Sequence, residues 1–228
     1  MTTNIDKNVI KAAVFDLDGT LLDTLSTIEF YLNKTLSSHG LPSVSRSQTM
    51  AFVGNGAAKL IERAMEAVGA DKTLFDSIYK SYNESYNADP YYLTTPYDGI
   101  AELIEELKSS GISLAVLSNK PDFAVKAAVD HFFPDSFDVV LGGREALPLK
   151  PDPTALLEMI SDFGLTPDEI CYIGDSEVDV LTAKKASVKK GFFVTWGFRS
   201  RDQLLTAGAI CLADSTTELM NLIETDVL

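Results

Sequence analysis

Two acidic residues mark the end of an apolar run in the stretch Val14-Phe15-Asp16-Leu17-Asp18-Gly19-Thr20-Leu21-Leu22-Asp23-Thr24. Residues two apart in an extended segment project to the same side, so Asp16 and Asp18 should crowd one point at the end of a strand. Like charges this close repel unless a cation lies between them or one carboxyl is protonated. Mg²⁺ resolves such a conflict, because it binds through one or two carboxylates and a substrate phosphate. From these residues alone, an ordinary turn with Asp18 as a helix cap remains the alternative.

Length and composition limit the class of protein. The chain has 228 residues, of which 46% are apolar, which fits one core plus an insert. Its 33 acidic against 19 basic residues give a net charge of −14, which argues against nucleic acid or an anionic membrane as a partner. No window approaches 18 uninterrupted apolar residues, and the N-terminal residues lack the apolar stretch of a signal peptide. We therefore expect a cytoplasmic protein, either a monomer or a homodimer.

The pattern of predicted elements changes near residue 91. A buried strand is predicted over 9–17, and helices are predicted from Thr24 to Gly40, after a capping box at 45–48, over 57–68 and over 71–88. From residue 98 onward, strands alternate with helices, which is typical of a parallel sheet. These strands are predicted at 112–117, 139–141, 170–173 and 191–195. The sequence thus predicts an α/β protein whose core is formed by 1–21 and 92–228, with 22–91 as an inserted all-helical block.

Polar residues follow the predicted strands at their carboxyl ends, where ligands bind in open parallel sheets. The first strand leads to Asp16 and Asp18, the next to Ser118-Asn119-Lys120, and the strand at 170–173 to Gly174-Asp175 with Asp179 further on. Lys150 stands immediately before the predicted helix start Pro151-Asp152-Pro153. We expect these side chains to meet at one edge of the sheet.

The string from Val14 to Thr24 resembles the first motif of the haloacid dehalogenase-like (HAD) superfamily, and the later residues resemble its other motifs in the expected order. The resemblance implies a Rossmann-like parallel core, Mg²⁺ and a phosphoaspartyl mechanism. It assigns Asp16 as nucleophile and Asp18 as general acid and base. Ser118, with Asn119 beside it, corresponds to the second-motif hydroxyl that binds phosphate, and Lys150 corresponds to the third-motif base. The implied metal ligands are Asp16, the backbone carbonyl of Asp18, Asp175 and Asp179.

The helical block corresponds to the mobile cap that members of this superfamily carry between their first and second motifs. Residues 52–57, Phe-Val-Gly-Asn-Gly-Ala, resemble the cap signature of phosphoglycolate phosphatases, and residues 192–198 also resemble that subfamily. Amides around Asn55 and Gly56 at a helix N-terminus, together with Arg63, could bind an anionic substrate tail. The alternative is a plain helix start with Asn55 as N-cap. Residues 183–187 depart from the subfamily pattern at the end of a helix.

The resemblance and the residues together predict a magnesium-dependent phosphatase that hydrolyses a small phosphorylated metabolite, with 2-phosphoglycolate as the leading substrate. A sugar-phosphate mutase of the β-phosphoglucomutase type shares the same motifs and is the enzymatic alternative. A non-catalytic phosphate-binding regulatory protein is the alternative from another class. A dehalogenase is disfavoured, because those members lack the second aspartate and Asp18 is present here.

Overall fold

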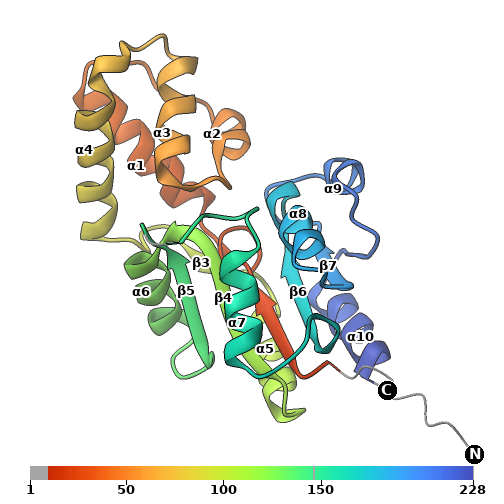
Figure 1. Ribbon diagram of the computed structural model, residues 1–228. Coiled ribbons are helices and arrows are strands. Elements are labelled where there is room, and N and C mark those ends of the chain that lie inside the picture. Colours follow the sequence, from red (N-terminus) through yellow and green to blue (C-terminus); the bar gives the residue numbers. More distant parts are fainter. Residues whose placement is uncertain (1–9, 146, 228) are drawn as a thin grey trace, which may run out of the picture.

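In residues 10–145 and 147–227, which the computed structural model describes, six strands form one sheet in the order β5-β4-β1-β6-β7-β8 (Figure 1). Every neighbouring pair is parallel, and β1 and β6 lie at the centre. The strands are β1 Ala12–Phe15, β4 Ser113–Pro121, β5 Val139–Gly143, β6 Ile170–Gly174, β7 Lys190–Val194 and β8 Leu212–Ala213. The predicted α/β class with a parallel sheet is therefore confirmed.

Helices cover both faces of this sheet. Successive residues of a strand point to opposite faces, so neighbouring residues of β1 contact different layers of helices. Along β1, Ala13 and Phe15 belong to one hydrophobic cluster, whereas Ala12 and Val14 belong to another. The first cluster draws on α5 (Ile100–Ser109), α6 (Asp122–Phe132) and α10 (Thr216–Val227). The second draws on α7 (Thr154–Asp162), α8 (Glu177–Lys185) and α9 (Arg201–Ala207). The two faces of β1 are thus buried equally, which explains its uninterrupted apolar sequence.

The helical block has a hydrophobic cluster of its own. The block consists of α1 (Leu25–Ser38), α2 (Arg46–Phe52), α3 (Gly56–Ala67), a 3₁₀ turn at Lys72–Leu74 and α4 (Phe75–Ala88). Figure 1 shows these helices grouped at one end of the sheet. Ala124 and Phe198, from the part of the chain that carries the sheet, belong to the same cluster. The division into a core (1–21 and 92–228) and a cap (22–91) stays a prediction, which the separate cluster supports.

Some boundaries differ from the sequence-based expectation, for local reasons. The predicted capping box is confirmed, since the Ser45 side chain accepts from the Gln48 amide at the start of α2. The helix expected from 71 begins instead as a 3₁₀ turn, because the Asp71 carboxylate binds the Thr73 amide. The helix expected to begin at Pro153, with Asp152 as its N-cap, begins at Thr154. The Asp152 carboxylate accepts a hydrogen bond from the Thr154 amide at 2.9 Å.

The two connections between the cap and the sheet pair with each other, which the sequence did not predict. Strand β2 (Leu22–Asp23) and strand β3 (Thr95–Pro96) form a two-stranded antiparallel sheet. Two-residue strands are too short to show an alternating pattern, so pairing across the insert reveals them only in three dimensions. This pairing holds the entry and exit of the helical block side by side. Within the described residues, no helix is long and apolar enough to cross a membrane.

Candidate active site

Asp16 directly follows the central strand β1, and its position is fixed by backbone contacts. Its amide donates to the Ile173 carbonyl at 2.8 Å, which continues the pairing with β6. Its Oδ1 accepts from the Leu17 amide at 2.7 Å. The turn that follows requires glycine at position 19, because φ is +90° there and a Cβ would lie 2.4 Å from the Asp175 carboxylate. The Asp-x-Asp-Gly string therefore places two chain segments in contact at the end of the sheet.

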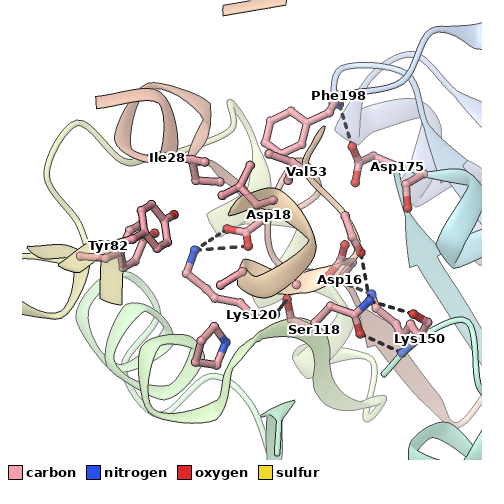
Figure 2. A pocket seen from close by; sticks show the side chains of 18 of the residues that line it. Asp16, Asp18, Ile28, Val53, Tyr82, Ser118, Lys120, Lys150, Asp175 and Phe198 are labelled. Carbon is pink, nitrogen blue, oxygen red and sulfur yellow. Dashed lines mark hydrogen bonds and ion pairs between the residues drawn. The ribbon is translucent and has the colours of Figure 1, made fainter. Parts of the chain in front are cut away.

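Lys150 reaches this carboxylate from the loop that precedes α7. Its Nζ lies 3.0 Å from Asp16 Oδ1 (Figure 2). It also lies 2.8 Å from Asp179 Oδ1 and donates to the Tyr172 hydroxyl at 3.0 Å. The lysine is buried. Burial alone would lower the pKa of this ammonium, but Asp16 and Asp179 raise it well above its ordinary value. The structure thus brings the predicted base into contact with the predicted nucleophile.

Asp16, Asp175 and Asp179 form a cluster of buried carboxylates, each with an oxygen within 4.8 Å of the others. Burial raises the pKa of Asp16 to about 7, Lys150 partly offsets this, and Asp179 and Asp18 add to the rise. Burial, together with Asp179 and Asp16, also raises the pKa of Asp175 well above its ordinary value. Such a cluster of oxygen ligands with an excess of negative charge fits a hard divalent cation.

Asp175 and Asp179 have different surroundings within this cluster. Asp175 accepts from the Phe198 amide at 2.7 Å. Asp179 has partners on both oxygens: Lys150 and the Tyr172 hydroxyl bind Oδ1, and the amide and hydroxyl of Ser176 bind Oδ2. It occupies the third position of α8, where it completes a capping box with Ser176. Asp179 is therefore well placed to hold Lys150, and its predicted contact with a metal stays a prediction.

The side chain of Asp18 points away from the three-carboxylate cluster. Its two oxygens lie 2.9 and 3.2 Å from the Nζ of Lys120, at the end of β4 (Figure 2). The same ammonium lies over the ring of Tyr86 in α4, 4.8 Å from its centroid. The sequence placed Lys120 among the polar residues at this strand end but assigned it no specific role. Its place directly after Ser118-Asn119 at a strand end was the available signal.

Ser118 and Asn119 are both buried at the end of β4 and line the pocket, but their side chains have different tasks. The Ser118 hydroxyl accepts from the Lys120 amide at 3.3 Å. The Asn119 amide group donates to the carbonyls of Gly54 and Lys150, each at 2.9 Å, and its oxygen accepts from the Lys150 amide. The Asn119 side chain thus joins the cap to the Lys150 loop, and its predicted contact with phosphate stays a prediction.

The cap residues predicted to bind an anionic tail lie differently from that expectation. Arg63 donates to the Phe52 carbonyl at 2.7 Å and to Asn55 Oδ1 at 2.8 Å. Asn55 is the N-cap of α3 but makes no side-chain capping bond. Among the described residues, the pocket lining includes Gly54 and Gly56 but neither Asn55 nor Arg63. Contact between the Arg63 guanidinium and the substrate is therefore not supported, because this group is used to fix the loop before α3.

Arg199 is a second contact between cap and core that sequence reasoning missed. Its guanidinium donates to the carbonyls of Met50 and Val53, each at 2.8 Å, and to Glu177 Oε2 at 2.7 Å. It follows the stretch 192–198 that resembles the phosphoglycolate phosphatase subfamily, which was the available signal. Together with Asn119, it binds the loop between α2 and α3 to the sheet, and residues of both cap and core line the pocket at this junction.

The chain belongs to the haloacid dehalogenase-like hydrolase family, whose profile matches residues 13–192. It is therefore an enzyme of the hydrolase class, as predicted. The parallel core, the inserted helices and the acidic residues after β1 and β6 are the features described above that agree with this membership.

Within the family, the chain is similar to phosphoglycolate phosphatases. It is 33% identical over 216 residues to the "Phosphoglycolate phosphatase" of Rhodospirillum rubrum, covering 92% of this chain and 89% of that protein. It is 30% identical over 217 residues to "Phosphoglycolate phosphatase 1" of Pseudomonas aeruginosa, covering 92% and 78%. A solved structure, described as a putative phosphoglycolate phosphatase from Lactobacillus delbrueckii subsp. bulgaricus, superposes with a TM-score of 0.87 at 31% identity and covers 94% and 98%.

Proposed function

We propose that the protein is a Mg²⁺-dependent phosphatase that hydrolyses a small phosphomonoester, 2-phosphoglycolate above all, through a phosphoaspartyl intermediate on Asp16. The observation that carries the proposal is the contact of 3.0 Å between Lys150 and Asp16 at a pocket edged by two further buried carboxylates. The relatives named as phosphoglycolate phosphatases support the substrate.

One oxygen of Asp16 is available for attack. Lys150 and the Leu17 amide both bind Oδ1, and within the described part of the chain Oδ2 has no hydrogen-bond partner. In the proposed reaction Oδ2 bonds to phosphorus while the bond from phosphorus to the ester oxygen breaks. Lys150 and the Ser118 hydroxyl hold the phosphoryl oxygens, where charge develops. The contacts of Lys150 with Asp16 and Asp179 fix its ammonium for this role.

Asp18 is the proton donor and acceptor in this proposal. In the first step its carboxyl gives a proton to the departing ester oxygen, so the product leaves as an alcohol. In the second step its carboxylate takes a proton from water, whose oxygen bonds to phosphorus and releases Asp16. For both steps the side chain must turn from Lys120, which it contacts at 2.9 Å, toward the reacting oxygen.

Asp16, Asp175 and the backbone carbonyl of Asp18 would hold the metal, with Asp179 behind them. When bound, Mg²⁺ supplies positive charge that lets a phosphate dianion approach a carboxylate. The buried three-carboxylate cluster fits this group because Lys150 is the one cation in contact with it among the described residues. A cytoplasmic location, and a monomer or homodimer, remain predictions of the sequence.

The test is phosphate release from 2-phosphoglycolate, measured with Mg²⁺ and again after exhaustive chelation with EDTA. We expect release with Mg²⁺ and its loss on chelation. Full activity without metal would contradict the metal-dependent mechanism, and no release under either condition would contradict the phosphatase. Glucose 1-phosphate, tested in parallel, should give little isomerised product. Rapid isomerisation without phosphate release would instead identify a sugar-phosphate mutase.

A further inference from the structure

The charged side chains that line the pocket all lie on its core side, where Asp16, Asp18 and Asp175 accompany the cations. Among the described residues that line it, three carry a cation: Lys120, Lys150 and Arg199. The cap side chains that line the same pocket are apolar or neutral, such as Leu60, Tyr82, Asn83 and Asn87. An anionic group on a bound substrate must therefore find its counter-charge on the core.

Two of these three cations already have partners that fix their roles. Lys150 lies between Asp16 and Asp179 and belongs to the phosphoryl end of the site. Arg199 binds Glu177 and the carbonyls of Met50 and Val53, so its guanidinium joins cap and core. Lys120 differs from both, because its charged partner is Asp18, the residue that the proposed reaction requires to move.

The Lys120 side chain is 6% exposed, and its ammonium contacts Asp18 (Figure 2). The ring of Tyr86 lies on its other side, with the centroid 4.8 Å away. A buried cation that loses its anion is strongly destabilised, because water does not replace the lost partner. When Asp18 turns toward the ester oxygen, Lys120 therefore needs another anion. A carboxylate on the leaving group, a few atoms from the phosphorus, would meet this need, and the neutral cap side chains beside it would add no competing charge.

We propose that Lys120 binds the carboxylate of the substrate's leaving group and so selects phosphorylated small acids. Its ammonium passes from Asp18 in the resting pocket to the substrate carboxylate during the reaction. This inference rests on the proposed phosphatase function. It assigns the anionic tail of the substrate to Lys120 instead of the cap residue Arg63. The cap then shapes the pocket and excludes water. The core supplies Lys150 for the phosphoryl group and Lys120 for the carboxylate.

The experiment compares two substrates of nearly equal size, 2-phosphoglycolate and 2-hydroxyethyl phosphate, in which a neutral CH₂OH replaces the carboxylate. Values of kcat/KM are measured for the wild type, Lys120→Met and Lys120→Arg. Lys126→Met is the matched control, because it removes a lysine whose side chain is 48% exposed and pairs with Asp122. We expect Lys120→Met to lose roughly 10- to 150-fold more activity on phosphoglycolate than on hydroxyethyl phosphate, the range typical of one charge-assisted hydrogen bond. Lys120→Arg should keep part of the preference, and Lys126→Met should leave it unchanged.

Product inhibition gives a second readout, because it does not require turnover of the phosphorylated acid. Glycolate should inhibit hydrolysis of hydroxyethyl phosphate less strongly in Lys120→Met, whereas inhibition by inorganic phosphate should stay the same. Equal losses on both substrates with unchanged glycolate inhibition would overturn the Lys120 proposal alone and leave this lysine a positioning residue for Asp18. A wild-type protein that releases phosphate from neither substrate would overturn the proposed function and this inference together.

Discussion

Replacement of Arg199 by Met should loosen the cap without disturbing the core. The Arg199 side chain is 7% exposed, and its guanidinium donates to the carbonyls of Met50 and Val53, each at 2.8 Å. Methionine has a similar length but no donor. Glu177, the third partner, is 41% exposed, so the substitution leaves its charge in contact with water. The main loss is therefore the pair of bonds to the cap.

The size of the effect follows from these bonds. A hydrogen bond to a charged group contributes about 1.5–3 kcal/mol. Both carbonyls gain water when the cap moves away, so we take that range for the pair together rather than for each bond. This corresponds to a roughly 10- to 150-fold shift toward the open cap. The KM for 2-phosphoglycolate should rise in proportion to the loss of the closed fraction, because substrate must then also drive closure.

Hydrogen–deuterium exchange measured by mass spectrometry is the direct assay. Peptides that cover residues 46–56 should exchange faster in Arg199→Met, whereas peptides from β1 and β4 should match the wild type. Arg201→Met is the matched control, since its side chain is 50% exposed and pairs with Asp214 at the surface, where an ion pair contributes little. Unchanged exchange of 46–56 together with an unchanged KM would refute this account of the contact between cap and core.

Three further predictions concern the site. Asp16→Asn should lower phosphate release by more than about 10⁴-fold, the usual scale for loss of a nucleophile; appreciable activity, with deamidation excluded by mass spectrometry, would contradict the assignment. Burial raises the pKa of Asp16 from 3.8 to about 7, so between these values the folded protein binds more protons than the unfolded chain and loses stability as pH rises. Because Mg²⁺ competes with those protons, it should raise Tm more at pH 8 than at pH 5.5, and equal shifts would argue against binding at the acidic cluster. Arg63→Ala should lower kcat/KM equally for 2-phosphoglycolate and an aryl phosphate, because Arg63 holds Phe52 and Asn55; a larger loss on phosphoglycolate would return it to the substrate site.

The order of the elements was predictable because it depends on local patterns. Apolar runs of strand length, capping residues and glycines lie within a few positions of the structure that they specify. The sequence accordingly predicted a parallel sheet whose strand ends carry Asp16, Ser118 and Asp175. Their meeting at one edge follows from the parallel arrangement itself, since all carboxyl ends of such strands lie together.

Local patterns did not predict the pairing of β2 with β3. They also did not predict that helices start at Phe75 and Thr154. The first depends on two dipeptides brought together across the whole insert, Leu22–Asp23 and Thr95–Pro96. The others depend on side chains of Asp71 and Asp152 that bind a nearby amide before the helix begins. In each case the deciding contact is too short or too specific to appear as a periodic pattern.

The sequence by itself determined which residue types stand at the strand ends, and with them the kind of chemistry. Only the tertiary structure decided which charge meets which. Asp18 and Lys120 are 102 positions apart, and Arg199 and Val53 are 146 apart, yet these contacts define the resting pocket and the position of the cap. Long flexible side chains such as Arg63, Lys120 and Arg199 can turn toward several partners, so packing of distant segments selects one of them. That selection is why the anion receptor we propose lies on the core, whereas the sequence placed it on the cap.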